Sequence, residues 1–362
     1  MNYFFISVAI ASAAILSCAY AASEPEKGTC ILPPSPNYGQ YEVNGVTNPD
    51  LAKAYDTVSL NYSCNRGYIV LGNSERICKQ GVWSDEPKCV QCGTITPAGE
   101  PLRRRRSTST RGELPWHVTV YSKKTTPYRR QCGATLVSSK AVLSVAHCFW
   151  DHSNNKPLPA QDFAVAVGKL HQHWDAVQDQ SAQTSDVSDI KIPPRFRGIA
   201  SNLQDDISVV ILASKITFTP FLRPVCLDFN EDSERRQLQA NNLGKIASWA
   251  PTGTNKDPSK VLRVLELPYI PIEECLSTLP SGFREFVTSD KICAGSTNGT
   301  GLCKGNSGSG ISFPDQNGGV SRYYLRGIAS SSPTSGDGDE CSQSLILFTQ
   351  VAKHEAFIKQ FI

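Results

Sequence analysis

Residues 305–310, Gly305-Asn306-Ser307-Gly308-Ser309-Gly310, decide how this chain of 362 residues is interpreted. They set one serine, Ser307, among residues small enough to let the backbone of a substrate approach. A serine acts as a nucleophile only where a base takes its proton and a third group orients that base. The rest of the sequence should therefore supply a histidine and a carboxylate.

Both residue types occur upstream with suitable neighbours. His147 follows a strand-like run and stands next to Cys148, so a disulfide at that cysteine would hold the histidine rigidly. Asp205 and Asp206 place a carboxylate just before the apolar run 207–210, which is typical of a buried strand. The order histidine, aspartate, serine matches the chymotrypsin arrangement and differs from the orders of subtilisin and the α/β-hydrolases.

The segments around these residues predict an all-β fold. Short runs that alternate or are β-branched, each bounded by turn residues, recur along the chain and predict a sandwich or a pair of barrels. These runs are His117–Tyr121, Ala141–Val145, Phe163–Val167, Ile207–Leu212 and Leu345–Val351. Only the C-terminal tail shows apolar residues near helical spacing, so it is the one helix that we expect.

Residues 103–362 resemble the chymotrypsin-like (trypsin-type) serine protease domain. The resemblance includes the segments around His147, Asp206 and Ser307. It extends to Gly112–Val118, Arg223–Leu227 and Ile292–Gly295. It implies a domain of two β-barrels that ends in a helix, and hydrolysis of peptide bonds through a serine acyl-enzyme.

The resemblance also implies a role for each site residue. His147 is the general base and Ser307 attacks the scissile carbonyl. Asp206 orients the histidine, and it is preferred to Asp205 because the carboxylate of this family immediately precedes the apolar run. The backbone N–H groups of Gly305 and Ser307 form the oxyanion hole.

The 13 cysteines indicate an oxidising compartment. Residues 1–21 are mostly apolar and end in the small-x-small pattern 19–21, which predicts a secretory signal peptide. Cys18 would leave with this peptide, so an even number of cysteines remains. Asn61 and Asn298 begin glycosylation motifs. We therefore expect a secreted, extracellular glycoprotein.

Several classes of function are disfavoured by the sequence. The net charge of +3 is too small to indicate a nucleic-acid-binding protein. After the signal peptide no stretch approaches 18 uncharged apolar residues, so no membrane span is expected. No motif has the spacing of metal ligands or of a phosphate-binding glycine loop, so neither a metal nor another cofactor is expected.

The segment 28–90 resembles the complement control protein (sushi) module. It contains four cysteines and the ending Gly81-Val82-Trp83-Ser84-Asp85-Glu86-Pro87-Lys88-Cys89. The resemblance implies the disulfides Cys30–Cys78 and Cys64–Cys89. About 60 residues bury too little surface to be stable without such cross-links. Whether the module acts as a spacer or binds a partner stays open.

The protease resemblance implies four further disulfides, namely Cys132–Cys148, Cys275–Cys293, Cys303–Cys341 and Cys92–Cys226. The last would tether the front module to the protease domain after a cut between them. A sushi-like module ahead of such a domain looks most like the modular serine proteases of arthropod haemolymph. Those act in clotting or immune cascades, so the expected partner is a protein substrate or another cascade protease.

The linker 91–111 departs from the family pattern. Family members mature by a cut that exposes an apolar amino terminus, which buries itself and pairs with an Asp before the nucleophile. Here the residues at the cut are four arginines, Arg103–Arg106, and the Asp position holds Asn306. Both halves of the ion pair have changed. The arginine run can be a solvated linker, a processing site or a site for a polyanion.

The residues expected at the specificity pocket also differ from the family pattern. The position at the pocket floor, six residues before Ser307, is Gly301, so a preference for Lys or Arg at the cut site is not expected. Ile346 falls near the pocket wall and should favour small side chains.

Three functions therefore remain open. The first is a secreted serine endopeptidase, because all three triad residue types are present. The second is a protease homologue that binds as a scaffold, cofactor or decoy, favoured by Asn306 and the narrowed pocket. The third is an adhesive or glycan-binding protein led by the sushi-like module.

Overall fold

The computed structural model describes residues 28–46, 49–50, 52–95, 112–249, 259–296, 305–315, 321–333 and 344–362. Several predicted features lie outside these residues, namely the signal peptide 1–21, the arginines 103–106, Gly301, Asn298, Cys303 and Cys341.

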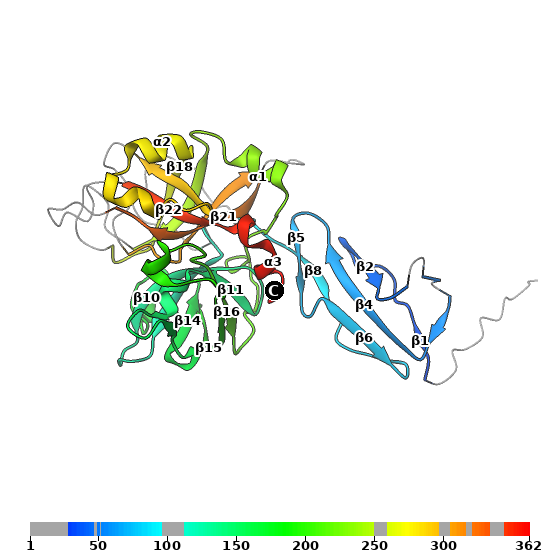
Figure 1. Cartoon of the computed structure of the whole chain (residues 1–362). Coiled ribbons are helices and arrows are strands. Elements are labelled where there is room, and N and C mark those ends of the chain that lie inside the picture. The colour runs from blue at the N-terminus through cyan, green and yellow to red at the C-terminus, as the bar shows by residue number, and fades with distance from the viewer. Residues whose placement is uncertain are drawn as a thin grey trace, which may run out of the picture.

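Two closed, six-stranded antiparallel barrels make up the larger part of the molecule (Figure 1). The first barrel has the order β10-β11-β16-β15-β14-β9, with β9 His117–Ser122, β10 Arg129–Leu136, β11 Ala141–Ser144, β14 Phe163–Val167, β15 Gln183–Lys191 and β16 Ser208–Leu212. The second has the order β17-β18-β19-β22-β21-β20, with β17 Leu243–Ser248, β18 Arg263–Ile270, β19 Lys291–Ser296, β20 Gly310–Asp315, β21 Arg322–Ser331 and β22 Ser344–Gln350. A small hairpin pairs β12 Trp150–Asp151 with β13 Lys156–Pro157.

Apolar strands account for the barrel interiors. Every residue of β11 and β14 is buried, which explains why these segments show as continuous apolar or β-branched runs in the sequence. Ile246, Phe313 and Phe348 form part of the core of the second barrel. Trp249 and Ile328 instead join the core of the first barrel, so apolar packing continues between the two.

The prediction that only the tail is helical was wrong. The tail does contain a 3₁₀ turn, Val351–His354, followed by α3 Glu355–Ile358, but there are also α1 Glu231–Gln237 and α2 Ile272–Thr278. Asn230 caps α1, because its side chain accepts a hydrogen bond from the Ser233 N–H at 3.0 Å. Helices of about two turns show too little periodicity to be seen in a sequence.

Further short 3₁₀ helices connect the strands, at Ala146–Phe149, Ala160–Asp162, Val177–Asp179, Gly198–Ser201 and Ser281–Phe286. No helix in the described part of the chain is both long enough and apolar enough to cross a bilayer.

A separate cysteine-rich module precedes the barrels. Its main sheet has the order β2-β4-β6-β7, and two pairs, β1 with β3 and β5 with β8, complete it. The strands are β1 Cys30–Ile31, β2 Gly39–Val43, β3 Ala54–Tyr55, β4 Thr57–Cys64, β5 Tyr68–Leu71, β6 Glu75–Lys79, β7 Val82–Trp83 and β8 Lys88–Gln91. Along β4, Val58, Leu60 and Tyr62 alternate with more exposed residues and form the small core. The two barrels and this module confirm the predicted all-β fold class.

The structure contains five disulfides among its described residues. They are Cys30–Cys78, Cys64–Cys89, Cys92–Cys226, Cys132–Cys148 and Cys275–Cys293. The third joins the end of the module to the segment before α1, and so it cross-links the module to the barrels.

The β5–β8 end of the module faces the barrels (Figure 1), and side chains near this end contact them. Arg66 donates to Asp315 Oδ2 at 2.6 Å and lies 5.3 Å from the ring centre of Tyr324. In the reverse direction, Arg322 donates to the Gly67 carbonyl at 3.0 Å and lies over the Tyr68 ring. The module is therefore docked on the second barrel by reciprocal arginine contacts.

Candidate active site

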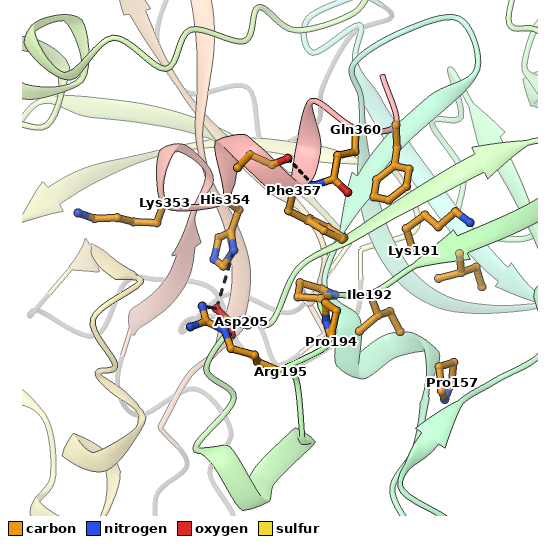
Figure 2. Close-up of a pocket in the computed structure, with 14 residues that line it drawn as sticks. Pro157, Lys191, Ile192, Pro194, Arg195, Asp205, Lys353, His354, Phe357 and Gln360 are labelled. Carbon is orange, nitrogen blue, oxygen red and sulfur yellow. Dashed lines mark hydrogen bonds and ion pairs between the residues drawn. The ribbon is translucent and has the colours of Figure 1, made fainter.

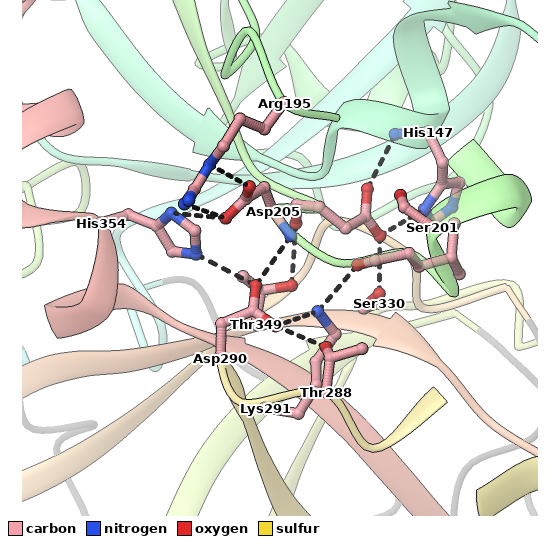
Figure 3. A network of polar contacts seen from close by, with 12 residues as sticks. His147, Arg195, Ser201, Asp205, Thr288, Asp290, Lys291, Ser330, Thr349 and His354 are labelled. Carbon is pink, nitrogen blue, oxygen red and sulfur yellow. Dashed lines mark hydrogen bonds and ion pairs between the residues drawn. The ribbon is translucent and has the colours of Figure 1, made fainter. Parts of the chain in front are cut away.

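His147 lies in the 3₁₀ helix that follows β11. The disulfide between Cys148 and Cys132 of β10 fixes this helix against the first barrel. The backbone N–H of His147 donates to Asp206 Oδ1 at 2.9 Å, and its Nδ1 lies 2.7 Å from Asp206 Oδ2 (Figure 3). Two hydrogen bonds to one carboxylate hold both the backbone and the ring of the histidine in place.

Asp206 is fully buried between the barrels. Ser330 of β21 donates to its Oδ2 at 2.6 Å, and Thr349 of β22 donates to its main-chain carbonyl at 2.8 Å. The sequence alone predicts neither hydroxyl as a partner of Asp206. They stand more than a hundred residues downstream in the other barrel, and no local pattern marks them as partners of the aspartate.

Burial and charge set the protonation states of this pair. Burial of the imidazole opposes its charged form, but the carboxylate of Asp206 outweighs burial and raises the pKa of His147. Burial likewise opposes ionisation of Asp206, yet His147 and the hydroxyl of Ser330 hold the pKa of this carboxyl below its ordinary value. Asp206 is therefore ionised, and its charge favours a proton on His147.

Ser307 stands in the turn before β20. Its carbonyl accepts a hydrogen bond from the Gly133 N–H of β10 at 2.8 Å. Gly308 follows with φ of +86°, and a Cβ there would lie 2.0 Å from the Gly133 carbonyl oxygen. Only glycine fits this close contact between the serine turn and the first barrel.

A pocket of about 300 Å³ opens at Ser307. Its lining comprises Gly305, Asn306, Ser307, Ala329, Ser330, Ser331, Ser332 and Ile346. None of these described lining residues carries a charge. Because Ser330 both lines this pocket and donates to Asp206, the pocket connects through one side chain to the His147–Asp206 pair. Gly305, Ser307 and Ile346 thus line one pocket, and Ser330 links that pocket to Asp206 and, through it, to His147.

Asp205, the residue before Asp206, belongs to a second polar cluster. Asp205, at φ of +59°, pairs with Arg195 at 3.1 Å, and its N–H donates to Asp290 at 2.9 Å (Figure 3). Asp290 in turn contacts His354 at 3.2 Å and Lys291 at 2.9 Å. These contacts fix the loop that ends in Asp206.

Three groups of this cluster could in principle hold a metal ion. The ligand atoms of Asp205, Asp290 and His354 lie within 4.8 Å of one another. However, the side chains of Arg195 and Lys291 already neutralise the two carboxylates. The donor set is therefore that of an ion-pair network around two buried carboxylates, in which the protein supplies the cations.

A larger pocket of about 540 Å³ lies beside this cluster (Figure 2). Pro194 and Phe357 contribute apolar walls, while Asp205 and His354 link the pocket to the ion-pair network. It shares no lining residue with the pocket at Ser307.

Comparison with known proteins agrees with this geometry. Residues 104–358 match the family model for trypsin, and residues 30–89 match the model for the sushi repeat (SCR repeat). Over 83% of its length the chain is 24% identical to the "Modular serine protease" of Drosophila melanogaster and 27% identical to "Clotting factor C" of Tachypleus tridentatus. It is 29% identical over 60% of its length to the "Proclotting enzyme" of Tachypleus tridentatus.

The chain spans 47%, 30% and 56% of these three relatives, respectively. The match to the trypsin model covers most of the chain, and it contains both barrels and the pocket at Ser307. The chain belongs to the trypsin family of serine proteases and carries a sushi repeat ahead of its protease domain.

Proposed function

We propose that the protein is a secreted serine endopeptidase that hydrolyses peptide bonds through an acyl-enzyme on Ser307. The observation that carries the proposal is the 2.7 Å contact between His147 Nδ1 and a fully buried Asp206, joined through Ser330 to the pocket at Ser307. His147 takes the proton of Ser307 as the serine attacks, and it later gives that proton to the leaving amine. The charge of Asp206 stabilises the imidazolium that forms in between.

The N–H groups of Gly305 and Ser307 stabilise the oxyanion of the tetrahedral intermediate in this mechanism. The pocket at Ser307 accepts the side chain of the substrate residue that precedes the cleaved peptide bond. Because its described lining is uncharged and Ile346 is 3% exposed, this pocket suits small, uncharged side chains.

The proposed setting is an extracellular clotting or immune cascade of the haemolymph type. It is supported by the names of the arthropod relatives and by the disulfide-rich module. Protein substrates or cascade proteases are the proposed partners, and glycans at Asn61 and Asn298 fit a secreted product. Asn61 is exposed on β4, as a glycan site requires. A polyanion at Arg103–Arg106 belongs to the same proposal.

The second candidate is a protease homologue that binds without cutting, as a scaffold, cofactor or decoy. Asn306 favours it, because the family's aspartate at this position helps to shape the oxyanion hole. Fluorophosphonate labelling of the purified protein tests the two candidates. Stoichiometric labelling that is lost in Ser307→Ala supports the endopeptidase, whereas a folded protein that takes up no label supports the binding homologue.

A further inference from the structure

Arg130 is a cation placed at the serine loop, where it contacts the backbone of Gly305. It lies on β10 beside a bulge in the pairing of β10 with β9, two residues before Cys132. In the described ranges no carboxylate lies within ion-pair distance of its guanidinium. The group instead donates to the carbonyl oxygen of Gly305 at 2.8 Å and lies 5.7 Å from the ring centre of Trp249.

A second contact holds the next residue of the loop. The hydroxyl of Ser248, the last residue of β17, hydrogen-bonds to the side-chain oxygen of Asn306, and both residues are buried. Ser248 is adjacent to Trp249, whose Nε1 donates to the Leu170 carbonyl at 3.0 Å. The indole is thus fixed, and it presents its face to Arg130.

The loop is therefore held from both barrels. Arg130 of the first barrel contacts Gly305, Ser248 of the second contacts Asn306, and the Gly133 N–H contacts the carbonyl of Ser307. In a family member with an aspartate before the nucleophile, the amino terminus exposed by the activating cut is buried and pairs with that aspartate. Its ammonium group would then be the cation at this loop. Here the residue is the neutral Asn306, and Arg130, a side chain of the folded barrel, places a cation near the loop.

We propose that Arg130, together with Ser248, positions residues 305–307 so that the oxyanion hole is already formed in the uncut chain. Arg130 is a positioning residue, since it acts through the peptide group of Gly305. The inference rests on the proposed function of Ser307, and it adds that a new amino terminus is not needed for reactivity.

The test compares fluorophosphonate labelling rates in the full-length mature chain. One protein carries all four arginines 103–106 replaced by glutamine, so that it stays uncut there, and the other is wild type cut in that run. We expect equal rates within about twofold. In the uncut background, Arg130→Gln should lower the rate by about 10²–10³, the effect of losing an oxyanion donor.

Three further measurements separate positioning from general stability. Arg130→Lys, which keeps the charge and a donor, should recover part of the rate. The affinity for a peptide aldehyde, whose hemiacetal oxygen occupies the hole, should fall in parallel with the rate in Arg130→Gln. Arg129→Gln, an exposed neighbour on the same strand, should match the parent in both assays. If Arg130→Gln does not fold, Ser248→Ala takes its place and should lower both quantities.

The outcomes are distinct. Labelling that appears only after the cut, or a rate in Arg130→Gln equal to that of the parent, overturns the inference and leaves the endopeptidase proposal standing. No labelling of any folded form, cut wild type included, overturns both.

Discussion

At the scale of single residues, the charge of Asp206 raises the pKa of His147. Without it, burial and the nearby Lys291 both act to lower the pKa of His147. We predict that Asp206→Asn reduces the rate of fluorophosphonate labelling by about 10⁴, because the imidazole loses its orientation and the stabilisation of its charged form.

The same variant should also shift the pH dependence of the labelling rate to lower pH. In the proposed mechanism only the neutral imidazole accepts the proton of Ser307, so the labelling rate should fall as the pH drops through the pKa of His147. Since Asp206 raises that pKa, Asp206→Asn should move the acid limb of the labelling profile to lower pH. An acid limb that stays in place or moves upward would contradict this electrostatic account.

Ile346 is a buried residue that lines the pocket at Ser307. We predict that Ile346→Ala, which removes a buried wall, shifts the preferred residue before the cut from small to larger apolar side chains in a peptide library. Its free energy of unfolding should fall by about 2–5 kcal/mol, as for other buried Ile→Ala changes. Leu347→Ala, buried on the same strand but absent from the pocket lining, is the matched control. It should lose stability without any change in preference, and an unchanged preference in Ile346→Ala would refute the assignment.

The sequence could indicate some of these residues and not others. His147, Asp206 and Ser307 stand in short segments whose neighbours are informative by themselves. Ser330 and Arg130 stand in ordinary strands, and their importance comes from contacts that span 124 and 175 residues, respectively. Such pairings arise only when the two barrels close and meet, so local chemistry does not predict them.

At the scale of elements, Asp290 joins three parts of the chain. It contacts the loop before β16 through Asp205, the start of β19 through Lys291, and the C-terminal helical segment through His354. Burial opposes its ionisation, but His354 and Lys291 hold the pKa of the Asp290 carboxyl far below its ordinary value. The ionised carboxylate therefore stabilises the folded state.

We predict that Asp290→Asn lowers the free energy of unfolding by about 3–5 kcal/mol at pH 7, because it leaves Lys291 buried without its partner. A group with a lowered folded pKa adds stability above its unfolded pKa and loses it as the pH falls through the folded value. Melting curves of the variant and the wild type should therefore converge as the pH falls below about 4.

Asp189→Asn is the control for this prediction. Asp189 is exposed and pairs with Lys191 at the surface, so its loss should cost less than about 1 kcal/mol. A difference between Asp290→Asn and wild type that persists or grows in acid would contradict the role given to the carboxylate.

The elements themselves differ in how far the sequence predicts them. Barrel strands such as β14 are short, consist of apolar residues that include β-branched valines, and are buried on both sides. A short continuous apolar run in the sequence predicts such a strand. Helix α1 depends on the cap at Asn230 and on burial of Glu234 and Gln237. Because both residues are polar, a search for hydrophobic periodicity does not predict that they are buried. Gln237 is held there by the Phe313 carbonyl and by Arg326, partners from the second barrel.

At the scale of the whole molecule, the module and the barrels form one docked unit. We predict that replacing both Arg66 and Arg322 by alanine frees the module to rotate about its covalent connection. Small-angle X-ray scattering should then show a broader distribution of distances, and hydrogen exchange should rise in β5.

Arg76→Ala is the control for the docking contact. Arg76 lies over Trp83 within the module, 5.0 Å from the ring centre, and the contacts described for it stay inside the module. Scattering of this variant should match that of the wild type. Identical scattering from the double alanine variant would show that the arginines do not fix the orientation.

The disulfide Cys92–Cys226 has a consequence for a chain cut in the linker. Two halves held by a short covalent link meet at an effective concentration of about millimolar, so redocking is a unimolecular event that dilution cannot reverse. A contact of two arginines with two tyrosines, Asp315 and the Gly67 carbonyl would be weak between separate proteins, yet here the disulfide keeps its two sides together. Release of the module from a cut chain then depends on reduction of this one disulfide, and the two halves stay joined for as long as the surroundings remain oxidising.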